Sequence, residues 1–439
     1  MKKLASLLLL GITTLSMLTG CSSSADQTAS ATSTAVDLVF WHSMSGTAGT
    51  AIDELVEQFN NSQDEITVKA EYQGAYDDAL TKLKSSALGN SGPDIMQLYD
   101  IGTRWMIDSG YALVLQDLAD GYDFSSIEEN ILEYYIVEGQ VHSMPFNTST
   151  PVLYYNKTAF EQAGLDPESP PTSLEEILEY SELLTGDGKY GFSMQVYGWF
   201  FEQFLNKMQL DYVDQGNGRD DSATQVVFDN NDGARVVFQT WKDMIDSGYV
   251  VNYGQDGTAV IESFASGNIA MTVGTTASLP TVIAYVGDAF ELGVGYYPSV
   301  NADDKGGISI GGGSLWAMDK GSDVKADAAF EFIKFMVEPQ SQLIWSQATG
   351  YFCVNTETYK LPEMIDFLEA NPLFAVAINQ LQESNNEAGA VLGVFTEARD
   401  AFEENLEKII SNELSVDEAV ERLTTTVNVA IKRYNASAN

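Results

Sequence analysis

The sequence predicts an α/β protein built from two bodies. Strand-like and helix-like segments alternate from residue 36 to residue 99, which is typical of parallel strands joined by right-handed crossovers. The chain has 439 residues, enough for two domains with separate cores. Its apolar content of 44% and aromatic content of 11% indicate a well-packed globular protein.

The first elements follow from alternating and helical spacing of apolar residues. One side of the first expected helix carries Ile52, Leu55, Val56 and Phe59. We expect strands at 36–41, 66–72 and 94–99, and helices around 52–59 and at 76–88. Ligands gather at the carboxyl ends of parallel strands, and Trp41 and Asp100 fall at two such ends.

The rest of the chain continues the α/β pattern and becomes largely helical toward its end. A capping box of Ser415 and Glu418 opens the last expected helix. We expect further strands at 151–156, 190–195, 290–297 and 314–318, and helices from about 158 and 173, at 232–247 and at 415–434.

The N-terminal 20 residues have the features of a secretory signal peptide. Lys2 and Lys3 precede an apolar stretch, residues 4–18, that is too short to span a bilayer. Leu-Thr-Gly-Cys at 18–21 resembles the lipobox of bacterial lipoproteins, which implies that Cys21 is acylated. The alternative is an ordinary signal peptide with an incidental cysteine. Residues 21–36, rich in Ser, Ala and Thr, are then a lipid-anchored tether that places the protein on the extracytoplasmic face of the cell membrane.

Charge and composition exclude several classes of function. With 63 acidic and 22 basic residues the formal charge is −41, which would repel nucleic acid and anionic lipid surfaces. The only histidines, His42 and His142, form no cluster with metal-ligand spacing, so we expect neither a metal site nor a cofactor. If Cys21 carries lipid, Cys353 has no disulfide partner and is best interpreted as a small core residue.

Two features leave a functional and a structural interpretation open. The glycine-rich run 306–314 lacks the Gly-Lys-Ser/Thr ending of a P-loop, so it is either a backbone anion site or a bend before a strand. Arg399 lies on or beside an apolar helical stripe that runs from Phe395 to Ile409. It either pairs with a carboxylate or captures a phosphate or carboxylate of a ligand. An Arg399 side chain that lies outside the gap between the two bodies, or that is tied off by a neighbouring acid, would end the argument for phosphate.

Several motifs resemble the extracellular solute-binding proteins of ABC importers (family 1). Within that family the likeness is to the subgroup that binds sn-glycerol 3-phosphate, and it runs from Phe40 nearly to the end. It is weakest between about Gln209 and Thr258. The motifs are FWHSM at 40–44, LYDIGT at 98–103, PFNTSTPVLYYNK at 145–157, AGLDP at 163–167, FASGNIAM at 264–271 and TGY at 349–351.

The resemblance implies a two-lobe, Venus-flytrap fold with hinge strands, each lobe a mixed sheet flanked by helices. On this basis residues 37–147 and 274–338 form lobe 1, and residues 148–273 and 339–439 form lobe 2. The chain would cross between the lobes near Asn147, Val273 and Glu338.

The resemblance also implies a set of ligand contacts. Asp100 stands where the subgroup has Glu, and Thr275 where it has Ser, so ligand contacts are expected to differ in detail. The expected ligand-binding residues are Tyr76, Asp100, Ser149, Thr275, Gly312, Tyr351 and Arg399, together with the aromatic residues Trp41 and Trp199.

The function implied is that of a non-enzymatic, monomeric receptor. It would capture glycerol 3-phosphate or a glycerophosphodiester such as glycerophosphocholine and deliver it to an ABC permease that has a separate ATPase. The acidic exterior favours the diester, whose choline offsets the phosphate charge. The alternatives are a mono- or oligosaccharide receptor and, from another class, a surface hydrolase, which the absence of a Gly-x-Ser-x-Gly elbow weakens.

Overall fold

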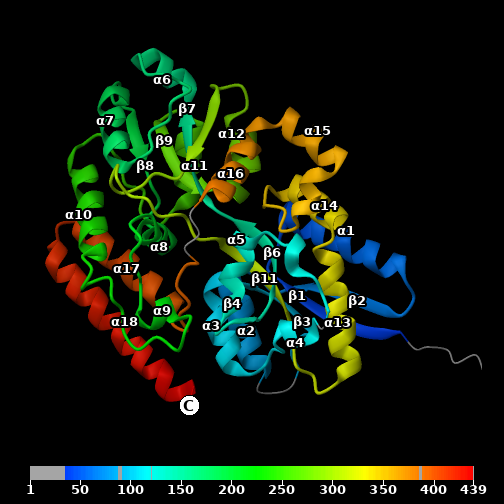
Figure 1. Ribbon diagram of the computed structural model, residues 1–439. Coiled ribbons are helices and arrows are strands. Elements are labelled where there is room, and N and C mark those ends of the chain that lie inside the picture. The colour runs from blue at the N-terminus through cyan, green and yellow to red at the C-terminus, as the bar shows by residue number, and fades with distance from the viewer. Residues whose placement is uncertain (1–34, 88–90, 120, 385–387, 439) are drawn as a thin grey trace, which may run out of the picture. The chain divides into compact units, whose positions relative to one another are not determined.

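Two sheets organise the computed structural model, which describes residues 35–87, 91–119, 121–384 and 388–438. The predicted signal peptide, residues 1–20, and Cys21 lie outside the described residues, as does nearly all of the expected tether. The first sheet has the order β2-β1-β3-β11-β6, the second the order β10-β7-β9-β8, and β4 and β5 form a small ribbon (Figure 1). The strands are β1 (Val36–His42), β2 (Ile66–Tyr72), β3 (Ile95–Tyr99), β4 (Ile136–Val137), β5 (Gln140–Val141), β6 (Met144–Ser149), β7 (Pro151–Asn156), β8 (Tyr190–Ser193), β9 (Ile269–Thr275), β10 (Leu292–Tyr296) and β11 (Gly311–Ala317).

The first sheet confirms the parallel crossover pattern. β1 pairs in parallel with β2 and β3, and the helices α1 (Gly46–Ser62) and α2 (Tyr76–Ala87) connect them. All four apolar residues expected on the inner side of the first helix are buried. β11 and β6 then extend this sheet antiparallel, so that the sheet is mixed.

The second sheet is also mixed. Its central strand β7 pairs antiparallel with β10 and β9, and β9 pairs in parallel with β8. The helices of the chain between β7 and β9 are α6 (Lys157–Ala163), α7 (Leu174–Leu184), α8 (Gly198–Lys207), α9 (Asp214–Gly218), α10 (Gly233–Asp246) and α11 (Gly257–Ala265). The predicted helix at 232–247 is therefore confirmed as α10.

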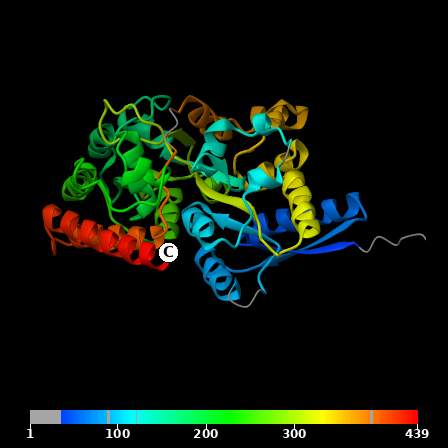
Figure 2. The same cartoon turned by 60° about the horizontal axis from the view of Figure 1, so that its bottom comes forward.

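The C-terminal part is helical, as expected. Ser415 and Glu418 form the predicted capping box, because Ser415 N donates to Glu418 Oε2 over 2.9 Å and Glu418 N donates to Ser415 Oγ over 3.3 Å. The helices after β9 are α12 (Leu279–Val286), α13 (Asp323–Met336), α14 (Pro339–Thr349), α15 (Pro362–Ala370), α16 (Pro372–Glu383), α17 (Phe395–Ile410) and α18 (Val416–Ala438). α17 and α18 pack on α8 and α10, beside the second sheet (Figure 2).

The order of the sheets corrects two of the expected lobe boundaries. Residues 274–338 were assigned to the first lobe, but β10 pairs with β7 in the second sheet, so that assignment is wrong for Leu292–Tyr296. The chain returns to the first sheet between β10 and β11. Residues 339–439 were assigned to the second lobe, but α14 packs on α1, and Trp345 contacts Phe146 with ring centroids 4.6 Å apart. Both errors have the same cause, since strand pairing and helix packing at these places depend on residues far apart in the sequence.

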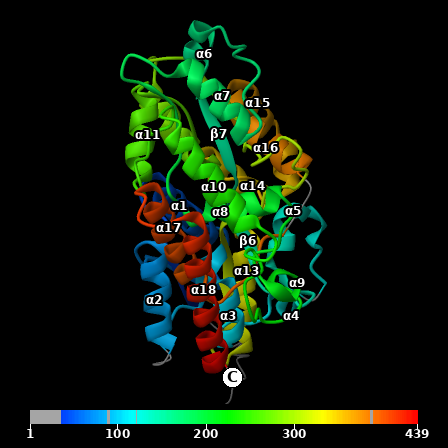
Figure 3. The ribbon, with the colours of Figure 1, turned by 90° about the vertical axis from the view of Figure 1, so that its left-hand side faces the viewer.

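The C-terminal helices also contact the first-sheet side of the molecule. The short helix α3 (Thr103–Ser109) lies next to α18, and Tyr434 donates its hydroxyl hydrogen to Asp108 over 2.7 Å. Figure 3 shows α17 and α18 beside α2 and α3. The two sheets are therefore bridged at their flanks as well as through the strand connections. Among the described residues, no helix is both long and apolar enough to cross a bilayer.

Candidate functional site

A cavity of about 150 Å³ brings together most of the residues that the sequence singled out. Elements of both sheets line it, because Ser149 and Gly312 come from the first sheet and Thr275 from the second. The lining residues are Tyr76, Tyr99, Asp100, Ser149, Tyr197, Trp199, Thr275, Gly311, Gly312, Tyr351 and Arg399. Eight of the nine expected ligand-binding residues thus share one cavity wall.

The cavity lies where strands end and helices begin. Asp100 follows β3 directly, Ser149 is the last residue of β6, and Thr275 is the last residue of β9. Tyr76 is the first residue of α2, and Tyr351 follows the end of α14. This placement is typical of α/β folds, in which ligands bind beside the carboxyl ends of the strands.

Arg399, on α17, is held by two carboxylates. Its Nε and Nη2 donate to Glu202 Oε1 and Oε2 over 2.6 and 2.9 Å, and Nη2 also donates to Asp100 Oδ2 over 3.2 Å. Nη1 makes no hydrogen bond with any residue that the structure describes. The ion-pair interpretation of Arg399 is therefore correct, and neighbouring acids tie off its Nε–Nη2 edge, so the argument for phosphate fails at that edge. The side chain also lines the cavity. Among the nitrogens of the guanidinium, only Nη1 is free to donate a hydrogen bond to a ligand atom.

Burial shifts the pKa values of Asp100, Glu202 and Arg399. It raises the pKa of Asp100 and of Glu202, while the nearby guanidinium acts in the opposite direction on both. Burial by itself would lower the pKa of Arg399, but the charges of Glu202 and Asp100 outweigh it and raise the pKa well above its ordinary value. Arg399 is thus permanently cationic.

A hydrogen-bonded chain fixes the tyrosine side of the cavity. Asn147 Nδ2 donates to the Tyr76 hydroxyl over 2.7 Å, and Asn147 Oδ1 accepts from Gln97 Nε2 over 2.7 Å. Tyr351 lines the same cavity. Tyr76 also stacks on Tyr99 with ring centroids 4.9 Å apart. Burial raises the pKa of both Tyr76 and Tyr351, so these hydroxyls stay protonated and can donate to a ligand.

The glycine-rich run divides at Gly311, because residues 306–310 precede β11 and residues 311–314 belong to it. Gly312 has φ +108°, and a Cβ there would lie 1.9 Å from the Asn147 carbonyl oxygen. Gly311 lies against the Trp199 ring, which a Cβ would approach to 2.7 Å. Glycine is therefore required for the strand to pass so close to the cavity wall.

Trp199 has an unsatisfied polar atom at the site. The indole is 3% exposed and lines the cavity, yet its Nε1 has no hydrogen-bond partner among the described residues. Because a buried, unpaired donor is costly, this N–H is suited to a ligand acceptor.

Trp41 is not among the residues that line the cavity, so its expected ligand contact stays a prediction. Its indole Nε1 donates to Glu71 Oε2 over 3.2 Å, and Glu71 is its direct neighbour on β2. The strand position was right, but the side chain points along the sheet to β2. Side chains of successive strand residues face opposite sides, so a position near the strand end does not fix which residue faces the ligand.

Three functional candidates, Glu202, Tyr99 and Asn147, were missed by sequence reasoning. All three support the site, and Tyr197 places its ring centroid 5.7 Å from Arg399 Cζ. The only available signal was indirect: a buried arginine must find an acid, but the sequence does not say which one.

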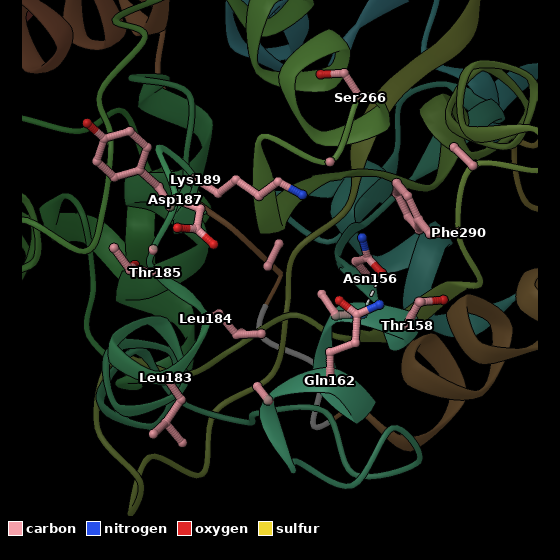
Figure 4. Close-up of a pocket in the computed structure, with 17 residues that line it drawn as sticks. Asn156, Thr158, Gln162, Leu183, Leu184, Thr185, Asp187, Lys189, Ser266 and Phe290 are labelled. Carbon is pink, nitrogen blue, oxygen red and sulfur yellow. Dashed lines mark hydrogen bonds between the residues drawn. The ribbon is translucent and has the colours of Figure 1, made fainter.

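Two further cavities deserve comparison with this one. A cavity of about 270 Å³ adjoins it and shares Tyr99, Tyr197 and Arg399. Another, of about 440 Å³, is lined by residues of the second-sheet side, with Asp187 and Lys189 as its only charged lining residues (Figure 4). It receives nothing from the first sheet, so movement of the two sheets relative to each other would not close it. In the part of the chain that the structure describes, no group of His, Cys, Asp and Glu could hold a metal ion.

Comparison with known proteins agrees with this geometry. The family model for bacterial extracellular solute-binding proteins matches residues 54–376. The chain is 30% identical over 417 residues to the sn-glycerol-3-phosphate-binding periplasmic protein UgpB of Pectobacterium atrosepticum, covering 92% of this chain and 93% of that protein. It is 31% identical over 413 residues to the corresponding protein of Yersinia pestis, covering 91% and 93%.

Solved structures share the fold. UgpB from Mycobacterium tuberculosis in complex with glycerophosphocholine has a TM-score of 0.77 at 24% identity, covering 91% of this chain and 100% of that chain. The cyclic alpha-maltosyl-1,6-maltose binding protein from Arthrobacter globiformis has a TM-score of 0.76 at 24% identity, covering 91% and 100%. The two-lobe α/β fold with two mixed sheets is thereby confirmed. The chain belongs to the bacterial extracellular solute-binding protein family and is the non-enzymatic, extracytoplasmic substrate-binding component of an ABC importer.

Proposed function

We propose that this protein captures glycerol 3-phosphate or a glycerophosphodiester such as glycerophosphocholine and delivers it to its permease. Relatives about 30% identical over nearly their whole length carry the name sn-glycerol-3-phosphate-binding protein. One observation supports the proposal most: the free Nη1 of Arg399 at the wall of a cavity that both sheets line. The free N–H group can donate a charge-assisted hydrogen bond to a phosphate oxygen.

The remaining cavity wall suits the glycerol part of such a ligand. Asp100 can accept from hydroxyl groups, and the hydroxyls of Ser149, Thr275 and Tyr76 can donate or accept. A volume of about 150 Å³ is small beside the roughly 300 Å³ at which pockets for drug-sized ligands begin. The cavity therefore favours a small solute, and the adjoining cavity leaves room for a headgroup.

Capture would proceed by closure of two lobes. Ligand that contacts both sheets at once favours the closed population, because only that state offers both sets of contacts. We propose that the lobes are centred on the two sheets, with the chain crossing at Ser149–Pro151, between β10 and β11, and again between α14 and α16. We further propose that Cys21 is lipid-modified, that residues 21–36 tether the receptor to the membrane, and that it acts as a monomer.

A neutral-sugar receptor is the second candidate, because Glu202 already fills one bidentate edge of Arg399. A thermal-shift and calorimetry screen of glycerophosphocholine, glycerol 3-phosphate and maltose separates the two. The proposal expects stabilisation by the glycerophosphates, since a ligand that binds only the folded state raises the melting temperature. Stabilisation by maltose alone would reject it.

Changing Arg399 to Ala provides the internal control for that screen. A glycerophosphate receptor should lose most of its affinity, whereas a sugar receptor should keep binding and only lose stability. Unchanged ligand recovered after incubation is expected, because the family is a transport component without enzymatic activity.

A further inference from the structure

The buried group around Arg399 contains two acidic side chains and one cationic side chain. One guanidinium faces two carboxylates, Glu202 and Asp100, at 2.6 to 3.2 Å. Side-chain exposures of 8%, 11% and 7% show that all three are largely removed from water. This buried group carries one net negative charge when both acids are ionised and no net charge when one of them is protonated, so neither state leaves Arg399 with an uncompensated positive charge. Interactions between charges in such a site are screened far less than at the surface.

Glu202 also occupies the part of Arg399 that a phosphate would use best. Nε and Nη2 form the side edge of the guanidinium, and both oxygens of Glu202 take it. A phosphate could enter that edge only by displacing Glu202, which would leave a buried carboxylate without its partner. A ligand phosphate is therefore restricted to the Nη1 end of the fork.

Acidic side chains also outnumber cationic ones in the lining of the adjoining cavity. Asp77, Asp400 and Glu403 line it, and Arg399 is the only cationic residue among its lining residues. Tyr99 and Tyr197 contribute aromatic rings to both cavities. Aromatic rings and carboxylates together suit a quaternary ammonium group, whereas they repel a second phosphate charge.

We propose that Glu202 is a specificity-determining residue, which occupies the bidentate edge of Arg399 and offsets its positive charge, and so selects zwitterionic glycerophosphodiesters over dianionic phosphate monoesters. This inference rests on the proposed function, since it concerns which member of the glycerophosphate class is bound. Arg399 anchors the single phosphate charge through Nη1, and Glu202 excludes further negative charge.

The test is a series of ligands that differ in net charge. Isothermal titration calorimetry at pH 7.5 would compare glycerophosphocholine, which is neutral overall, glycerophosphoglycerol with one negative charge, and glycerol 3-phosphate, which is close to dianionic because its second pKa is about 6. The expected result is that affinity falls along this series, by about tenfold or more between its ends.

Glu202→Gln tests the residue itself. Glutamine keeps the shape and an oxygen that can accept from Arg399 Nε, but it removes the charge. We expect the preference for glycerophosphocholine over glycerol 3-phosphate to shrink by about tenfold. Glu404→Gln is the matched control: it removes one charge from α17 at an exposed ion pair with Lys408 and Arg422, and should leave the ratio unchanged.

The outcomes are distinguishable. Wild-type protein that binds glycerol 3-phosphate as tightly as glycerophosphocholine overturns the inference but leaves the proposed function intact, and this comparison needs no variant to fold. A Glu202→Gln protein with native circular dichroism and an unchanged ratio also overturns it. If wild-type protein binds none of the three ligands, the proposed function fails and this inference fails with it.

Discussion

Gly198 lies directly against the side chain of Arg399. A Cβ at position 198 would come within 2.6 Å of Arg399 Cγ and 2.8 Å of its Cα. Gly198 is the first residue of α8, and its N–H donates to Glu403 Oε1 over 2.9 Å. The absence of a side chain at this position therefore lets α8 approach α17 closely enough for Glu202 to reach Arg399.

Gly198→Ala should weaken ligand binding, although it adds only one methyl group. The added methyl group must push Arg399 or α17 away, which disturbs the guanidinium geometry and costs about 1–3 kcal/mol of stability. Calorimetry with glycerophosphocholine and urea denaturation would measure both effects. Gly186→Ala is the control, since no atom lies within 4 Å of a Cβ there and its φ is not positive. Unchanged affinity in Gly198→Ala would show that the close approach does not position Arg399.

Asn147→Ala should damage the tyrosine side of the site. The change removes the partner of both Gln97 and Tyr76, so two buried polar groups lose a hydrogen bond. We expect a loss of about 1–3 kcal/mol in the free energy of unfolding, and weaker binding because the Tyr76 hydroxyl is no longer fixed. Asn268→Ala, which removes an exposed contact to Ser266, should change neither quantity. Native stability in Asn147→Ala would contradict this account.

Local pattern was enough to predict seven of the eleven described strands but fewer than half of the described helices, and it missed β6 and β9, which carry Ser149 and Thr275. β2 and β7 begin and end at the residues expected, because a strand pattern depends only on residues that are adjacent in the sequence. β11 was expected three residues later than it begins, since glycine weakens a strand in isolation. Gly312 is required by the Asn147 carbonyl oxygen, which belongs to a strand more than 160 residues away, and Gly311 is required by the Trp199 ring.

The site could be predicted only in part. Eight expected contacts line the cavity because the resemblance carried their positions, not because spacing revealed them. Glu202 lies 197 residues before Arg399, and no periodicity connects the two. Composition supplied only a general rule, that a buried arginine in an acidic chain finds a carboxylate. The identity of that carboxylate depends on how α8 packs on α17.

Arg219→Ala should destabilise the protein. The side chain donates to the carbonyl oxygens of Tyr134 and Ile136, before β6, and to those of Ala388 and Gly389, before α17. Losing these bonds should lower the free energy of unfolding by about 2–4 kcal/mol, since several buried carbonyls lose a charged donor.

Lysine should restore only part of the stability that Arg219 provides, because an ammonium cannot span the positions of a planar guanidinium. Urea denaturation followed by circular dichroism would rank wild type, Arg219→Lys and Arg219→Ala in that order. Arg235→Ala, at a partly exposed ion pair with Asp417, is the matched control and should change stability by less than about 1 kcal/mol. Equal stability of Arg219→Ala and wild type would show that water replaces these contacts at no cost.

Cys353 should be unreactive in the native protein and should make stability depend on alkaline pH. It is 1% exposed and packs with Leu343 and Met364, and burial raises its pKa from 9.0 to about 12. The folded state therefore keeps the thiol proton at a pH where the unfolded chain releases it. Stability from this group is complete below pH 9.0 and is lost as pH rises toward 12, by about 1.4 kcal/mol per pH unit. Subtracting the unfolding free energies of Cys353→Ala from those of wild type, from pH 8 to pH 11, isolates this slope from the tyrosines and lysines that titrate in both proteins. A flat difference, or rapid labelling by a thiol reagent at pH 8 without denaturant, would mean that water reaches the sulfur in the folded state.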